Sequence, residues 1–313
     1  MAFAALFPGQ GSQAVGMLAD FEASCPEVKE TFSEASDALG YDLWSVAQDG
    51  PADQLSLTEI TQPLMLTAGV ALYRSWLSRD GASASFMAGH SLGEYTALTA
   101  AGSLQLADAV RLVRSRGQFM QEAVPQGTGA MAAVIGLDDD KIESVCAEVA
   151  ASTSLVIEAV NYNAPGQLVI AGHADAIEAS LPMLKDAGAK RALPLPVSAP
   201  FHCALMKPAA DRLQAELDAI DVKAPSVPVI QNVSIEPESD ISVIRAQLIQ
   251  QTFSPVRWTQ TVRRFEGLGI QAAAEFGPGA VLSGLAKRIQ TTAQHFPLGT
   301  HELFSKALQE ING

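Results

Sequence analysis

The stretch Ser85-Phe86-Met87-Ala88-Gly89-His90-Ser91-Leu92-Gly93 decides how this chain is expected to fold. Its first four residues are typical of a short buried strand, and residues 92–101 are rich in helix formers. The pattern G-x-S-x-G predicts a sharp strand-to-helix turn that exposes Ser91 at a helix N-terminus, where the helix dipole favours developing negative charge. The pattern is short and recurs by chance, so an ordinary serine in a glycine-rich turn explains it equally well when it is taken alone.

The composition is that of an ordinary globular protein, with 313 residues of which 48% are hydrophobic and 17% are charged. The formal net charge is −14, whereas a non-specific nucleic-acid binder carries the opposite balance. The charge is uneven, because residues 241–313 carry seven Lys or Arg and four Asp or Glu. No apolar run is long enough to span a bilayer. We therefore expect a protein that binds neither nucleic acid nor membranes.

Three cysteines stand far apart in the sequence, at Cys25, Cys146 and Cys203. An odd number, wide spacing and the lack of a C-x-x-C pair argue against a disulfide framework and against a zinc site. The N-terminal segment has no basic start and reaches Pro8-Gly9 too soon for a signal peptide. Together these features predict a cytoplasmic protein without a metal.

The order of the expected elements predicts an α/β fold in two parts. Residues 127–197 follow the order β-α-β-β-α-β, which is the ferredoxin-like arrangement. We interpret them as a small subdomain that is inserted into a large α/β domain made of residues 1–126 and 198–313. In the large domain, periodicity predicts strands at 2–7, 227–233 and 272–276 and helices at 27–39, 63–76, 92–101, 106–123, 205–220, 241–251 and 258–268.

A serine nucleophile needs a base, for which the chain has five histidines. His202 lies in the loop Ala199-Pro200-Phe201-His202 before a helix, where an imidazole can be presented to another segment; capping of that helix is its alternative role. The side chain of His90 is expected to point away from Ser91. No acidic residue between Ser91 and His202 is well placed to orient the base, so a backbone carbonyl is an alternative orienting group.

Two further features allow more than one function. The loop Gly9-Gln10-Gly11-Ser12-Gln13-Ala14 fits the dinucleotide pattern G-x-G-x-x-G/A, but the acidic residue expected at the end of a second strand is missing. The same loop is compatible with an oxyanion hole. Arg116 shares an expected helix with Arg111 and Arg114; such arginines are usually solvated, but one turned inward would bind a carboxylate through two hydrogen bonds.

Taken together, these motifs resemble those of the bacterial malonyl-CoA:acyl carrier protein transacylases of type II fatty acid synthesis. The resemblance covers essentially the whole chain. It rests on six separated motifs in the same order, FPGQGSQ at 7–13, GHSLGE at 89–94, RSRGQFM at 114–120, NYNAPGQ at 161–167, PFH at 200–202 and EFGPG at 275–279. It implies a hydrolase-like α/β core with an inserted ferredoxin-like subdomain.

The resemblance also implies a role for each matching residue. Phe201 stands where some members have serine, and an aromatic residue there is common in malonyl-selective relatives. The resemblance makes Ser91 the nucleophile and His202 its base. The backbone N–H groups of Gln10 and Leu92 would form the oxyanion hole. Arg116 would bind the malonyl carboxylate, and the backbone carbonyl of Gln251 would orient His202.

The implied reaction is ping-pong transfer of a malonyl group from malonyl-CoA to the phosphopantetheine thiol of acyl carrier protein, by a monomer with no cofactor. Because carrier proteins are acidic and this chain is acidic too, docking requires a local basic face, for which the candidates are Lys190, Arg191, Lys287 and Arg288. A polyketide pathway instead of fatty acid synthesis stays open. A serine hydrolase is the nearest alternative, and a dinucleotide-binding oxidoreductase is a more distant one.

Overall fold

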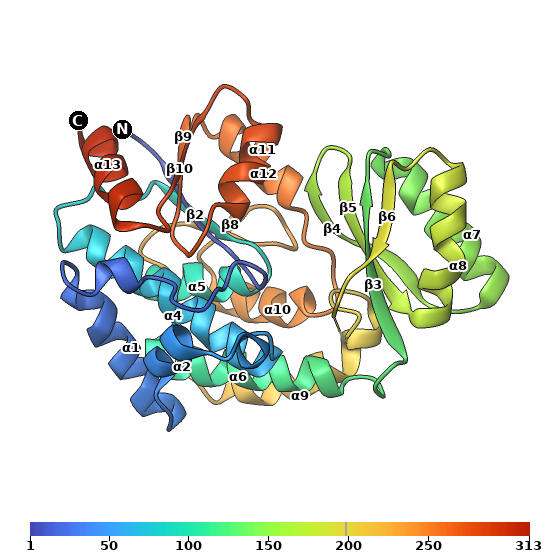
Figure 1. The fold of residues 1–313 in the computed structure, drawn as a ribbon, viewed down its shortest axis with the longest axis horizontal. Helices are drawn as coiled ribbons and strands as arrows, with labels where there is room; N and C mark the ends of the chain where they lie inside the picture. The colour runs from blue at the N-terminus through green and yellow to red at the C-terminus, as the bar shows by residue number, and fades with distance from the viewer. Residues whose placement is uncertain (198) are drawn as a thin grey trace.

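The computed structural model describes residues 1–197 and 199–313 and has a mixed α/β fold with two separate sheets (Figure 1). The α/β class predicted from the sequence is thereby confirmed. Residue 198, the expected first residue of the second large-domain segment, lies outside the described residues. The larger sheet and its helices occupy one side of the molecule, and the smaller sheet with helices α7 and α8 occupies the other.

The larger sheet has six strands in the order β10-β9-β1-β2-β7-β8. The first five are parallel to their neighbours, and β8 runs antiparallel to β7. All four residues of β1 and of β9 are buried, as expected for a parallel sheet that is covered on both faces. The strands span Ala4–Phe7 (β1), Phe86–Gly89 (β2), Val229–Ile230 (β7), Pro237–Glu238 (β8), Ala272–Glu275 (β9) and Gln294–Pro297 (β10).

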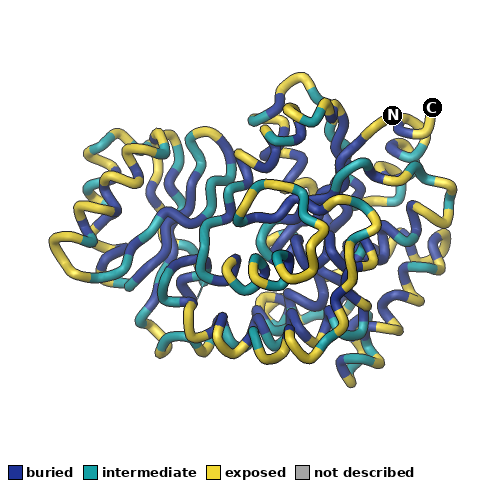
Figure 2. Tube along the Cα trace, turned by 180° about the vertical axis from the view of Figure 1, so that it is seen from behind, coloured by how far each residue is buried: buried dark blue, intermediate teal, exposed yellow. Residues whose placement is uncertain are grey.

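Helices pack on both sides of this sheet, and their apolar residues form its core. The buried parts of the chain gather in the interior of the molecule (Figure 2). An aromatic cluster of Phe7, Tyr73, Trp76, Phe276 and Phe304 lies on one side, with ring centroids 5.2 to 6.2 Å apart. The helices span Pro26–Leu39 (α1), Leu43–Asp49 (α2), Ala52–Leu55 (α3), Thr58–Leu77 (α4), Leu92–Ala100 (α5), Leu106–Glu122 (α6), Lys207–Asp218 (α9), Ile241–Gln251 (α10), Trp258–Gly267 (α11), Val281–Ile289 (α12) and His301–Asn312 (α13), with short 3-10 turns at Ala19–Phe21 and Ala204–Met206.

The smaller sheet has four antiparallel strands in the order β4-β5-β3-β6. Helices α7 and α8 cover the face that is turned away from the larger sheet, and they enclose a separate hydrophobic core (Figure 1). The elements follow one another as Gly129–Ile135 (β3), Asp139–Thr153 (α7), Ile157–Ala164 (β4), Gln167–His173 (β5), Ala174–Asp186 (α8) and Arg191–Pro194 (β6).

Two expected elements differ most from the structure. The helix predicted at 63–76 begins at Thr58, with Pro63 inside it. Pro63 is the sixth residue of the helix, beyond the first four residues whose N–H groups have no intrahelical acceptor, so it removes one hydrogen bond of the helix. The strand predicted at 227–233 is confined to Val229–Ile230, because the chain turns after it and the N–H of Gln231 bonds to the carbonyl of Glu236. This turn places Asn232 next to the end of β2.

Candidate active site

Ser91 lies between β2 and α5 with φ 53° and ψ −111°, a backbone conformation that residues with a side chain rarely adopt. Such a residue costs about 1–3 kcal/mol and persists only where its surroundings fix it. Two glycines allow the tight crossing, since a Cβ on Gly89 would come within 1.7 Å of the carbonyl carbon of Gly93. A Cβ on Gly93 would lie 1.9 Å from the carbonyl oxygen of Phe7.

The side chain of Asn232 holds this turn in place. Its Oδ1 accepts a hydrogen bond of 2.9 Å from the N–H of Ser91, and its Nδ2 donates one of 2.7 Å to the carbonyl of Gly89. Its own backbone N–H donates to Oε2 of Glu94 at 3.0 Å. Asn232 is buried, so these bonds are shielded from competing water. The strained turn is thus fixed by a segment that is distant in the sequence.

His202 lies within hydrogen-bond distance of Ser91. Its Nε2 is 2.7 Å from Oγ of Ser91, and its Nδ1 is 2.9 Å from the backbone carbonyl of Gln251. Because a carbonyl only accepts, Nδ1 carries the proton and Nε2 has the lone pair that faces the hydroxyl. Burial, together with the charge of Arg116, lowers the pKa of His202 to about 3. The imidazole is therefore neutral at neutral pH, as a general base must be.

Arg116, on α6, points inward and is buried. Its Nη2 donates to Oγ of Ser91 at 3.3 Å and to Oε1 of Gln251 at 2.9 Å, and its Nη1 donates to Oε1 of Gln62 at 2.9 Å. All three acceptors are neutral oxygens. A buried guanidinium beside the serine, held by neutral groups, can bind an incoming carboxylate. Arg114, by contrast, bonds to the carbonyl of Leu39.

Ser91, His202 and Arg116 line a cavity of about 340 Å³. Met131 on β3 and Asn161 on β4 form part of its wall, so the cavity lies where the two sheets meet. Leu92 is the first residue of α5, and the N–H at that position has no acceptor within its helix. The residues predicted for the site that line this cavity are Gln10, Ser91, Leu92, Arg116, Phe201 and His202.

The glycine-rich loop after β1 packs against the serine turn. A Cβ on Gly9 would lie 2.6 Å from the carbonyl oxygen of His90, which explains why a glycine is needed at this position. The side chain of His90 lines the same cavity as Ser91, and its Nε2 lies 2.8 Å from Oδ1 of Asn163, so its hydrogen-bond partner is Asn163 and not Ser91. The loop glycine is thus accounted for by packing, without a bound dinucleotide.

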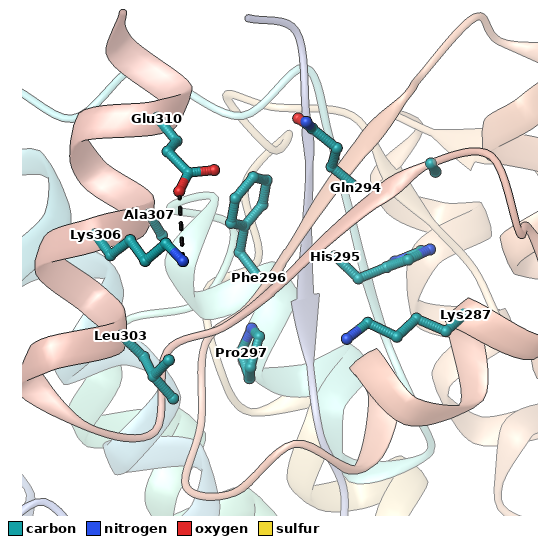
Figure 3. Close-up of a pocket in the computed structure, with 10 residues that line it drawn as sticks. Lys287, Gln294, His295, Phe296, Pro297, Leu303, Lys306, Ala307 and Glu310 are labelled. Atoms are coloured by element: carbon teal, nitrogen blue, oxygen red, sulfur yellow. Dashed lines mark ion pairs between the residues drawn. The ribbon is translucent and has the colours of Figure 1, made fainter.

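The four basic residues proposed for docking lie outside this cavity. Lys190 and Arg191 are exposed at the start of β6. Lys287 points into a different pocket of about 390 Å³, between α12, β10 and α13 (Figure 3). Arg288 turns toward the β4–β5 hairpin, where it donates to Oε1 of Gln167 and, at 3.2 Å, to the carbonyl of Pro165. The two neighbours Lys287 and Arg288 therefore face different surroundings.

Three residues of the site were missed in the sequence, Gln62, Glu94 and Asn232. Glu94 and Gln62 carried a signal, because each is a polar residue among the apolar residues of a predicted or adjoining helix. Asn232 fell within a predicted strand and had no signal of its own. Within residues 1–197 and 199–313, no group of three His, Cys, Asp or Glu side chains could hold a metal ion, and no helix could cross a membrane.

The comparison with known proteins agrees with this geometry. The family model for the acyl transferase domain matches residues 5–301 of the chain. The chain belongs to the acyl transferase family. The malonyl CoA-acyl carrier protein transacylase of Escherichia coli K12 is 56% identical over 307 residues, which cover 98% of this chain and 99% of the relative.

Solved structures lead to the same family. A malonyl transacylase in complex with the acyl carrier protein of a type II polyketide synthase superimposes with a TM-score of 0.97 at 49% identity, over 99% of this chain and all of that chain. The malonyl CoA-acyl carrier protein transacylase of Coxiella burnetii gives 0.97 at 47% identity, over all of this chain and 98% of the other. The resemblance found in the sequence is confirmed, and the chain is an acyltransferase.

Proposed function

We propose that this acyltransferase moves the malonyl group from malonyl-CoA to the phosphopantetheine thiol of acyl carrier protein, and so supplies the chain-extender unit for fatty acid synthesis. The observation that carries the proposal is the guanidinium of Arg116 at 3.3 Å from Oγ of Ser91, which is itself 2.7 Å from Nε2 of His202. A nucleophile, a neutral base and a buried cation therefore meet at one point. The names of the relatives support the same substrates.

In the first half-reaction, Oγ of Ser91 attacks the thioester carbonyl while Nε2 of His202 takes its proton. The carbonyl oxygen becomes an oxyanion, which the backbone N–H groups of Gln10 and Leu92 stabilise. The carbon–sulfur bond then breaks, and His202 returns the proton to the leaving thiolate of coenzyme A. The product is malonyl-Ser91, an oxygen ester.

In the second half-reaction, the phosphopantetheine thiol of the carrier protein gives its proton to His202 and attacks malonyl-Ser91. The same two N–H groups stabilise the second oxyanion, and the proton goes to Oγ of Ser91 as the ester bond breaks. Throughout, the backbone carbonyl of Gln251 holds Nδ1 of His202 and fixes the tautomer. The order of events is ping-pong, because coenzyme A leaves before the carrier protein reacts.

Arg116 separates this proposal from a serine hydrolase. A simple esterase needs no cation beside its nucleophile, whereas a malonyl group carries a carboxylate two bonds from the reacting carbonyl. A substrate without that carboxylate would leave the buried guanidinium unpaired, which costs free energy. Phe201, which lines the cavity, would limit the space beside the malonyl group.

We also propose the finer fold assignment. The antiparallel order β4-β5-β3-β6 in a β-α-β-β-α-β unit supports a ferredoxin-like subdomain at 127–197. The strand-to-helix serine turn at the end of a parallel strand supports a hydrolase-like core formed by 1–126 and 198–313. We further propose that the protein is a cytoplasmic monomer that needs no cofactor. The candidates for carrier docking are two basic clusters, Lys190 with Arg191 and Lys287 with Arg288.

Intact-mass measurement after mixing with malonyl-CoA tests the function. We expect a mass increase of one malonyl group on the wild type, located on Ser91 by peptide mapping, and its transfer to holo acyl carrier protein. Ser91→Ala should give no adduct. Rapid release of free malonate without transfer would instead indicate a hydrolase, and an adduct on another residue would overturn the assignment of Ser91.

A further inference from the structure

Glu94 is a fully buried acid that the proposed reaction does not use. It lies in the first turn of α5, and its side chain is 0% exposed. Its Oε2 accepts two hydrogen bonds, from Nε2 of Gln251 at 2.8 Å and from the backbone N–H of Asn232 at 3.0 Å. Its Oε1 has no hydrogen-bond partner. A buried carboxyl group with one oxygen unpartnered is costly, which indicates a role beyond packing.

The principal partner of Glu94 is the side-chain amide of Gln251, which also contacts the candidate catalytic groups. Nε2 of Gln251 donates one hydrogen to Glu94 and the other to the backbone carbonyl of Ser91, at 2.9 Å. Oε1 of Gln251 accepts from Nη2 of Arg116 at 2.9 Å. A chain of hydrogen bonds therefore runs from carboxyl group to amide to guanidinium and ends 3.3 Å from Oγ of Ser91.

Only one orientation of this amide satisfies all its neighbours. If the amide were rotated by half a turn, its oxygen would face the carbonyl of Ser91, which has no hydrogen to donate, and Oε2 of Glu94, which already accepts from the N–H of Asn232. Its NH₂ group would face the guanidinium of Arg116, which has only donors. Glu94 and Ser91 thus ensure that Gln251 presents an oxygen to Arg116.

We propose that Glu94 is a positioning residue for carboxylate recognition: its Oε2 fixes the side-chain amide of Gln251, and the amide holds the guanidinium of Arg116 beside Ser91. The inference rests on the proposed function, since it concerns the substrate carboxylate that Arg116 would bind. Its consequence is specific. Loss of the acceptor at position 94 should impair the transfer of acyl groups that carry a carboxylate more than that of acyl groups that lack one.

The test compares Ser91 acylation by malonyl-CoA and by acetyl-CoA in Glu94→Ala and Glu94→Gln. We expect Glu94→Ala to lower kcat/KM for malonyl-CoA by about tenfold to a hundredfold, which is the cost of a lost buried hydrogen bond, and to lower that for acetyl-CoA by less than about threefold. Glu94→Gln keeps an acceptor oxygen at the Oε2 position, so it should restore malonyl acylation to within about threefold of the wild type.

Glu275→Gln is the matched control. Glu275 is also 0% exposed, but its carboxyl oxygens accept from the backbone N–H groups of Leu282 and Ser283 at the start of α12. Its substitution should change thermal stability and leave the malonyl-to-acetyl ratio unchanged. Circular dichroism melting of every variant shows whether it is folded at the assay temperature.

A double-mutant cycle separates the effect through Gln251 from the effect through Asn232. In a Gln251→Leu background, Glu94→Ala should no longer change the malonyl-to-acetyl ratio, because the amide that it acts on is absent. An equal loss of both substrates in Glu94→Ala, or a Glu94→Gln variant as impaired as Glu94→Ala, would overturn the proposal. If the wild-type enzyme itself showed no preference for malonyl-CoA over acetyl-CoA, the proposed function would be overturned instead. The two failures are therefore distinguishable.

Discussion

The two sheets contribute to the candidate active site in different ways. The six-stranded sheet, which is parallel except at β8, supplies residues of the site from the ends of its strands, with Gln10 after β1, Ser91 after β2 and Asn232 after β7. The four-stranded antiparallel sheet supplies side chains of the cavity wall, Met131 and Asn161. Chemistry is thus concentrated at one sheet, and the other limits the space around it.

The difference follows from how strands are connected. Parallel neighbours need long crossovers, so residues far apart in the chain meet at the carboxyl edge of one sheet. Antiparallel neighbours can be joined by hairpins, as β4 and β5 are, and these bring together residues that are close in sequence. Variants at the larger sheet should therefore change the rate of the chemical steps, whereas variants at the smaller sheet should change how the substrate fits the cavity.

The largest effect is expected at the base. His202→Ala should slow both half-reactions by several orders of magnitude, because the serine hydroxyl then has no proton acceptor. Met131→Ala, on the wall formed by the smaller sheet, should change KM more than the rate of acylation. Stopped-flow or quenched-flow measurement of malonyl-Ser91 formation checks both. Full transfer activity in His202→Ala would contradict the assignment of the base.

Substitution of the cation should change selectivity. Arg116→Ala removes charge-assisted hydrogen bonds to the substrate carboxylate, so malonyl acylation should fall by about a hundredfold or more, while acetyl acylation changes far less. Arg114→Ala, on the outer side of the same helix, is the control and should leave the ratio unchanged. If both acyl groups lose activity by the same factor in Arg116→Ala, the arginine is structural.

Two glycines, Gly93 in α5 beside the larger sheet and Gly166 between two strands of the smaller sheet, should differ in their tolerance to substitution. Gly93→Ala would place a Cβ 1.9 Å from the backbone oxygen of Phe7, so we expect a loss of more than about 4 kcal/mol in the free energy of unfolding. Gly166, in the β4–β5 hairpin, has φ +69° and no atom within 3.7 Å of an added Cβ. Gly166→Ala should cost only the backbone strain, about 1 kcal/mol. Urea denaturation measures both, and equal losses would contradict the comparison.

Glu94 should make stability depend on pH. Burial raises its pKa to about 7 from the ordinary 4.5, so the folded protein holds a proton that the unfolded chain releases above pH 4.5. The proton on Glu94 therefore adds to the free energy of unfolding. This stabilisation is fully present below pH 4.5 and is lost as the pH rises to about 7, a decrease of about 3 kcal/mol in total. Glu94→Gln should lack this loss, whereas Glu178→Gln, at an exposed position of α8, should follow the wild type in urea titrations at pH 4.5 and 8.

The smallest effect is expected at the docking face. Lys287→Glu with Arg288→Glu should weaken the use of carrier protein by about tenfold and reduce its salt dependence, while malonyl-Ser91 formation from malonyl-CoA stays largely intact. The pair Lys190→Glu and Arg191→Glu tests the face on the smaller sheet in the same way. Unchanged carrier kinetics in both double variants would place docking elsewhere, and equal losses in both half-reactions would indicate a folding defect.

The sequence predicted the site where its signals are local. The pattern around Ser91, the loop that carries His202 and the basic helix of Arg116 each stand within a few residues, and the family resemblance added Gln10, Leu92 and Gln251. The structure brings Ser91, His202, Arg116 and Gln251 into hydrogen-bond contact. Periodicity was less successful at element ends, such as the start of α4, because tertiary packing offsets the local cost of a proline.

By itself, then, the sequence determined the α/β class, the strand-to-helix serine turn and the family, because turn glycines, hydrophobic periodicity and motif order can all be recognised along the chain. Only the tertiary structure decided that Asn232 holds the serine turn, that Gln62 holds Arg116 and that Glu94 orients Gln251. These contacts join residues 54 to 157 positions apart. A hydrogen bond depends on distance and direction in space, and for such pairs the packing of helices α4, α5, α6 and α10 and of the larger sheet sets both.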